Sequence, residues 1–157
     1  MAKFFETSED IRDLVLTKFE ETGLSQMGIE LKLISVTKNK NVLKASKAGA
    51  TVQYLTKKDA FLIIYEEALD RLSDEYKEKL IEGALSNISY DTEKDKLIVE
   101  SDIAKEIFRM RKKYANYTDI LETSYAVISE IEEEEKQRKE EEKATRAAEK
   151  QARKRNN

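Results

Sequence analysis

The residue types that most often perform catalysis are missing from this sequence. The chain of 157 residues has no histidine and no cysteine, which excludes a serine triad with a histidine base, a thiol nucleophile and a thiolate zinc site. Its four glycines, at positions 23, 28, 49 and 83, are too widely spaced for a phosphate-binding loop or a dinucleotide fingerprint. Carboxylates are so abundant that no pair stands out for acid–base chemistry.

The acidic segment 91–102 comes nearest to a metal-binding pattern. Its acids at positions 91, 93, 95 and 102 are spaced like parts of a calcium loop. However, Lys96 stands where such a loop needs glycine for its sharp turn, and the twelfth position is Asp102 rather than a bidentate glutamate. A turn leading into a strand is therefore the preferred interpretation, and we expect neither a metal nor another cofactor.

Hydrophobic periodicity indicates the elements that would position any site. Apolar residues recur at helical spacing in 9–23, 74–88 and 102–114, and they alternate with polar residues in 29–33. The uninterrupted apolar run 61–65 predicts a buried strand, with shorter strands near 42–43 and 96–100. Ser73 is a candidate helix cap. The expected fold class is α+β, with three or four short strands packed by helices, plus a long charged C-terminal helix.

From Thr118 onward, neither glycine nor proline interrupts a helix. The first third is apolar enough to pack on the chain's own body, which we prefer, or on a partner; its candidate contact residues are Ile120, Tyr125, Val127, Ile128 and Ile131. The tail 132–157 has nothing larger than alanine to bury and lacks the a and d residues of a coiled coil. Pairs such as Glu132–Lys136 favour a solvated helix, and disorder is the alternative.

The order of elements and several local motifs resemble a known family. After Leu55-Thr56 and the strand Asp59–Ile64 come the helix "LSDEYKEKLIEGALSN" (72–87) and Ser101-Asp102-Ile103. Together they are similar to the zinc metallopeptidases of tailed bacteriophages, small zincin-like proteins distantly similar to SprT-type proteases. The resemblance covers most of residues 1–115 and implies a zincin-like domain there, followed by an amphipathic helix over 116–131 and the charged tail 132–157.

The resemblance also identifies the positions of the family's zinc site. In that family a helix carries His-Glu-x-x-His and a further histidine follows downstream, because histidines four residues apart share one helix face and bind zinc together. In this chain the corresponding residues are Gly83, Ala84, Asn87 and Ser101, none of which supplies the expected ligand or base. The resemblance therefore implies the fold without the activity, so we expect no enzyme. Alternatively, Gly83 serves only to let its helix approach a neighbouring strand.

These observations favour a non-catalytic bacteriophage protein that acts by binding another protein, a pseudoenzyme in the host cytoplasm. The N-terminus lacks the pattern of a signal peptide, and no apolar run is long enough for a membrane span. A nucleic-acid-associated phage factor is the alternative, because residues 143–157 hold six bases and one acid; its candidate contacts are Arg146, Lys150, Arg153, Lys154 and Arg155. A structural virion component and an enzyme with an unrecognised site also remain open.

Overall fold

A four-stranded sheet lies at the centre of the chain in the computed structural model, which describes residues 2–156. Met1 and Asn157, the outer ends of the predicted domain 1–115 and tail 132–157, lie outside these residues. The strands are ordered β1-β2-β4-β3, with β2 and β4 parallel and both edge strands antiparallel to their neighbours. Their bounds are Phe4–Phe5 (β1), Leu31–Val36 (β2), Leu43–Lys47 (β3) and Ala60–Ile64 (β4).

The two central strands of the sheet, β2 and β4, contribute buried side chains to the core. Leu33 of β2 lies opposite Leu62 of β4 in the register, and both side chains are buried. The alternation in 29–33 and the run 61–65 thus correspond to neighbouring strands. These are β2 and β4. Because they are parallel, the chain must cross over between them, and it does so through β3 and the short helix α2, Ala50–Thr56.

A separate two-stranded hairpin follows the sheet in sequence. Its strands are Ile88–Asp91 (β5) and Lys96–Val99 (β6). The Oδ1 atom of Asp91 accepts hydrogen bonds from the backbone N–H groups of Glu93 and Lys94, at 3.0 and 3.2 Å, so this carboxylate closes the turn. The chain thus has six strands among its described residues, and the expected three or four is too few. The α+β class and the long C-terminal helix are confirmed.

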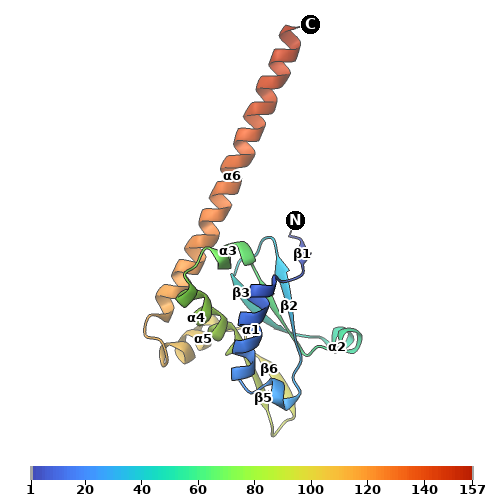
Figure 1. Cartoon of the computed structure of the whole chain (residues 1–157), viewed down its shortest axis with the longest axis vertical. Coiled ribbons are helices and arrows are strands. Elements are labelled where there is room, and N and C mark those ends of the chain that lie inside the picture. Colours follow the sequence, from blue (N-terminus) through green and yellow to red (C-terminus); the bar gives the residue numbers. More distant parts are fainter. Residues whose placement is uncertain (1, 157) are drawn as a thin grey trace.

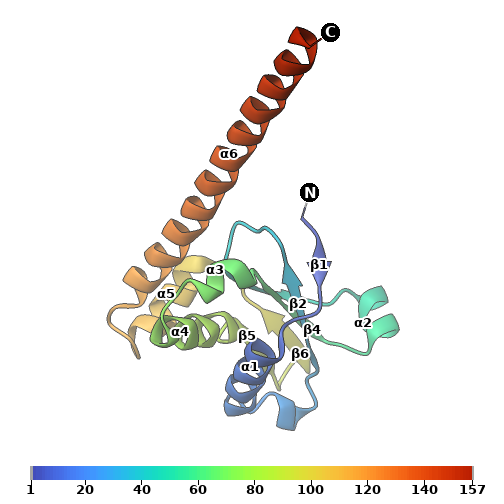
Figure 2. The same ribbon diagram turned by 45° about the horizontal axis from the view of Figure 1, so that its top comes forward.

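The helices pack mainly on one another and on the sheet edge formed by β3 (Figures 1 and 2). Helix α4 contacts α1, β3, α5 and α6, whereas α2 stands apart from the other helices and buries no residue. Ser73 caps α4 as expected, because its side chain accepts a hydrogen bond from the N–H of Tyr76. The bounds of the remaining helices are Glu9–Glu21 (α1), Ser25–Met27 (the 3-10 helix η1), Glu66–Asp70 (α3), Asp74–Leu85 (α4), Ile103–Arg111 (α5) and Tyr117–Arg155 (α6).

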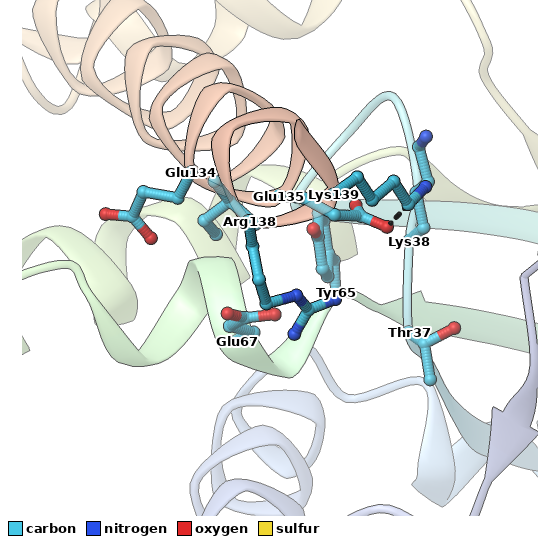
Figure 3. A pocket seen from close by; sticks show the side chains of 9 residues that line it. Thr37, Lys38, Tyr65, Glu67, Glu134, Glu135, Arg138 and Lys139 are labelled. Atoms are coloured by element: carbon cyan, nitrogen blue, oxygen red, sulfur yellow. Dashed lines mark ion pairs between the residues drawn. The ribbon is translucent and has the colours of Figure 1, made fainter. Parts of the chain in front are cut away.

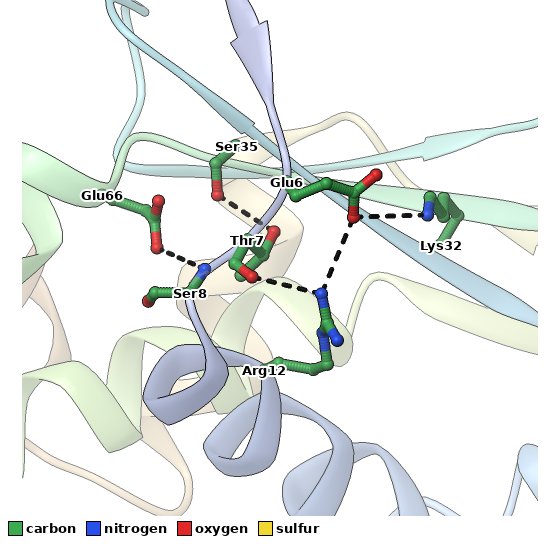
Figure 4. A network of polar contacts seen from close by, with 7 residues as sticks. All are labelled: Glu6, Thr7, Ser8, Arg12, Lys32, Ser35 and Glu66. Carbon is green, nitrogen blue, oxygen red and sulfur yellow. Dashed lines mark hydrogen bonds and ion pairs between the residues drawn. The ribbon is translucent and has the colours of Figure 1, made fainter.

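Polar contacts fasten the start of α1 to the sheet and to α3 (Figure 4). The buried carboxylate of Glu66 accepts a hydrogen bond of 3.0 Å from the backbone N–H of Ser8. The buried hydroxyl of Ser35 on β2 donates to that of Thr7 at 3.0 Å. These bonds satisfy groups that would otherwise be buried without partners, and they fix the direction in which α1 leaves β1.

Helix α6 has two parts that differ in burial. Its inner half, residues 117–131, contributes to the same hydrophobic core as the sheet and α4. Its outer half, residues 132–155, leaves the body as one straight rod (Figure 1), and every side chain from Lys136 to Arg155 is exposed. The outer half is about 36 Å long. Of the two expectations for this segment, a solvated helix is the one observed. Within residues 2–156, no helix combines the length and apolarity needed to cross a membrane.

Candidate functional site

Gly83 on α4 lies against Tyr117, the first residue of α6. A Cβ atom at position 83 would lie 1.8 Å from the Tyr117 hydroxyl oxygen and 2.6 Å from its Cζ atom. Both residues are buried, so the ring has little freedom to move away. The glycine is therefore required by close packing, as one interpretation of the sequence expected, but its neighbour is a tyrosine of α6 rather than a strand.

Tyr117 leads into a chain of polar side chains, which we call the Glu106 network. The Tyr117 hydroxyl donates a hydrogen bond of 2.8 Å to one carboxylate oxygen of Glu106, on α5. The Asn87 side-chain amide donates one of 2.6 Å to the other oxygen, and Arg109 in turn donates to the Asn87 carbonyl oxygen. Both oxygens of a buried carboxylate are thus paired, which removes most of the cost of burying it.

The electrostatic setting keeps the Tyr117 hydroxyl protonated. Burial raises the pKa of Tyr117 far above its usual range, and the negative charge of Glu106 and their hydrogen bond raise it further. A neutral phenol is the form that can donate to the carboxylate. The Glu106 network is therefore arranged as a stable structural contact.

Two of the positions that correspond to the zinc site of the resembled family come together. Asn87 and Ser101 line one pocket of about 260 Å³, together with Glu106 and Tyr125. Ala84 lines a smaller neighbouring cavity of about 40 Å³ that Glu106 and Tyr125 also border. The fourth position, Gly83, is covered by the Tyr117 ring.

The groups around this pocket do not fit a zinc ion. Structural and catalytic zinc sites are built from imidazole, thiolate and carboxylate ligands, and the chain has neither of the first two. The Glu106 carboxylate is fully paired, and the Asn87 carbonyl oxygen already accepts from the cationic Arg109. No three acidic side chains among residues 2–156 converge into a group that could hold a metal ion.

The structure places most of the predicted partner contacts in the core. Ile120, Val127, Ile128 and Ile131 are buried against the chain's own body, so they are not available to a partner. Only Tyr125 remains accessible, with 40% of its surface exposed, at the rim of the pocket that Asn87 and Ser101 line. Docking of this apolar segment on the body was the preferred expectation, and the burial of these four residues agrees with it.

The predicted nucleic-acid contacts lie at the opposite end of α6. Arg146, Lys150, Arg153, Lys154 and Arg155 are all exposed on the outer half of the helix, far along the rod from the body (Figure 1). They share no pocket with Asn87 or Ser101. Any function of these bases is thus separate from the site on the body.

A third region, a groove of about 440 Å³, lies where α6 leaves the body (Figure 3). Lys38 and Glu67 of the body line it together with Glu134, Glu135, Arg138 and Lys139 of α6. Several of these charges are already paired: Lys139 contacts Glu135 at 3.2 Å, and Arg71 beside the groove binds Glu134 at 2.7 Å. The Arg71–Glu134 pair thus joins the rod to the body, whereas the Lys139–Glu135 pair lies within α6, and the balanced charge of the groove points to no ligand.

Sequence reasoning did not single out Glu106, Arg109 or Tyr117. A signal for Glu106 was present, because it lies three residues after Ile103 and four before Met110, on the apolar face of its helix. A charged residue at such a position destabilises the fold unless it belongs to a buried hydrogen-bonded network. Nothing in the local sequence pairs it with Tyr117, which comes from the next helix.

Comparison of the chain with protein-family models, with curated proteins and with solved structures finds no match in any of the three. The zincin-like relationship therefore has only the residues of this chain to support it.

Proposed function

We propose that this chain is a non-catalytic binding protein whose body is a zincin-like domain with a closed site. The observation that carries the proposal is the contact of Tyr117 with Gly83. In the family that the sequence resembles, position 83 would hold the first zinc ligand. In this chain the same space is filled by a tyrosine from α6, so a histidine there and Tyr117 in its present position are mutually exclusive.

The Glu106 network supports the same proposal. Asn87 stands at the position of the second ligand, and its side chain is committed to Glu106 and Arg109. A catalytic site needs a group that can exchange its partner for water or substrate, whereas Glu106 is buried and these side chains are paired with one another. Asn87 thus helps to stabilise the contact between α4, α5 and α6.

Binding to a protein partner, in phage or host, is the activity that remains for such a body. Helix α2 supports it, because Tyr54 and Leu55 are 74% and 72% exposed on a helix that touches no other helix closely. Tyr125 adds an exposed aromatic side chain near the pocket. The bacteriophage setting and the cytoplasmic location follow from the resemblance alone.

Restoring the ligands tests the zincin-like relationship. The variant combines Gly83→His, Asn87→His and Ser101→His with Tyr117→Ala, which makes room at position 83. We expect it to bind one zinc ion per chain, measured by metal analysis after dialysis. The matched control carries alanine at all four positions and should bind none. A folded restored variant that binds no zinc contradicts the relationship.

The unmodified chain tests the other half of the proposal. We expect it to bind no stoichiometric zinc and to leave casein intact. We also expect the unmodified chain to retain a protein partner during purification from cells that produce it naturally, and Tyr54→Ser with Leu55→Ser to weaken that retention. Casein cleavage, or the absence of any partner from a strictly monomeric chain, contradicts the proposal.

A further inference from the structure

Basic residues follow a regular spacing along the outer half of α6. Counted along the chain, they are separated alternately by three and four positions. We call this set the basic stripe; its members are Lys136, Lys139, Lys143, Arg146, Lys150 and Arg153.

The spacing places all six side chains on one face of the helix. A repeat of seven residues drifts by only about 20° on a straight α-helix, so two rows that span less than three repeats stay within a sector of about 100°. From Lys136 to Arg153 the stripe extends about 26 Å along the axis. Every one of these residues is exposed. Lys139 borders the groove at the body, and beyond it the rod extends away from the body (Figures 1 and 2).

Neighbouring acids form weak, exposed pairs along the rod, some of them with members of the stripe. Glu135 pairs with Lys139 at 3.2 Å, and Glu142 lies 3.9 Å from Arg138. Exposed pairs of this kind are weak and exchange readily with other partners. Glu142 and Glu149 each lie four positions before a stripe arginine, so they border the stripe at the spacing of weak exposed pairs.

The stripe argues against a second copy as its partner. Positions spaced by three and four residues are those at which two helices of a coiled coil meet. Six cations at these positions would face like charges in a second copy. The outer half also has no apolar residue larger than alanine, whereas protein interfaces depend on buried apolar or aromatic anchors.

We infer that the basic stripe binds the phosphodiester backbone of nucleic acid. A linear row of cations without aromatic or large apolar neighbours matches a linear row of phosphates, for which charge neutralisation and counterion release supply the affinity. The stripe contains no amide or aromatic side chain to read or stack on bases, so the binding is independent of sequence. It needs no contribution from the body and is separate from the proposed function of the body.

The first measurement is the salt dependence of binding to a labelled 20-base-pair DNA duplex, followed by fluorescence anisotropy with the full chain. Six phosphate contacts predict an affinity that falls by about a thousandfold between 50 and 200 mM salt. A single-stranded oligonucleotide of the same length serves as a second probe and should bind with a shallower dependence. No binding to either probe at 50 mM salt overturns the inference.

The second measurement compares two pairs of substitutions with the same charge change. Arg146→Gln with Arg153→Gln removes two members of the stripe, and Arg138→Gln with Arg155→Gln removes two arginines of the same helix outside it. The first pair should weaken duplex binding about tenfold or more at 100 mM salt and reduce the slope of log K against log salt by about 1.8. The second should change the affinity much less.

Equal losses in the two variants, with helicity unchanged by circular dichroism, would mean that net charge alone binds DNA, and they overturn the inference. Two other results would do the same. One is stripe-dependent binding to phosphatidylserine vesicles that exceeds binding to DNA. The other is a dimer in sedimentation that the Arg146→Gln, Arg153→Gln variant abolishes. Because none of these tests involves zinc or the body, their failure is distinguishable from failure of the proposed function.

Discussion

The inner half of α6, residues 117–131, and its outer half, residues 132–155, form one uninterrupted helix but are held by different forces. The inner half buries its apolar face against α3, α4 and α5, and its first residue pairs with Glu106. The outer half has intrinsic helix propensity, pairs within the helix such as Glu135–Lys139 and, at its base, the ion pair of Glu134 with Arg71 of the body. A change of the same kind should therefore unfold the body when made in the inner half and only loosen the rod when made in the outer half.

The largest effect is expected at Ile120, which is fully buried in the core. Ile120→Ala should reduce the free energy of unfolding by about 2–5 kcal/mol, because it removes apolar contacts and leaves a cavity. Urea denaturation, followed by far-UV circular dichroism, measures this loss of stability. A loss below about 1 kcal/mol would mean that the inner half is not part of the core.

Gly83→Ala tests the contact between α4 and α6. The added methyl group would overlap the Tyr117 hydroxyl, so we expect a loss of about 1–3 kcal/mol despite the better helix propensity of alanine. Combining it with Tyr117→Ala should remove most of that additional cost. Additive losses in the double variant would contradict the packing account.

Tyr117→Phe tests the hydrogen bond to Glu106 alone. It leaves one oxygen of a buried carboxylate without its donor, which should cost about 1.5–3 kcal/mol at neutral pH. The raised pKa of Tyr117 predicts the pH dependence as well. An unfolded tyrosine releases its proton near pH 10 while the folded one keeps it, so this contribution is complete below about pH 10 and declines above it.

The parent chain and the Tyr117→Phe variant should therefore differ in how steeply their free energy of unfolding changes with pH. Between about pH 10 and 11.5, the parent chain should lose stability more steeply than Tyr117→Phe. Parallel curves over this interval would show that Tyr117 ionises as readily in the folded chain as in the unfolded one.

Ala148→Gly in the outer half should have the smallest effect on the body. Glycine costs about 1 kcal/mol in an exposed helix, but here that cost falls on a segment that frays by itself. We expect a lower helical signal at 222 nm with an unchanged midpoint for unfolding of the body. A shifted midpoint would indicate that the outer half contributes to global stability.

The parts of the fold that could be predicted are those with a strong local pattern. The helical spacing in 9–23 and the apolar run 61–65 correspond to α1 and β4, and Ser73 is the observed cap of α4. β1 could not be found, because its two phenylalanines are exposed and gain their strand character only by pairing with β2. Ile88 fits the helical stripe of α4, yet it begins β5, because pairing with Val99 outweighs its spacing.

The candidate site was only partly predictable for the same reason. The presence of an unusual glycine at position 83 is a local feature, but its cause is Tyr117, which lies on another helix. The pocket likewise depends on β6 bringing Ser101 beside Asn87. Such contacts are set by tertiary packing, which a periodic pattern within one segment does not contain.

Hydrogen exchange along α6 tests the division of this helix most directly. In the unbound chain at low salt, we predict that backbone amides of residues 121–131 exchange only by global unfolding of the body. Amides of residues 136–155 should exchange orders of magnitude faster, because their hydrogen bonds open by local fraying. Equal protection of the two segments would contradict the account, since one helix would then be held by the same forces throughout.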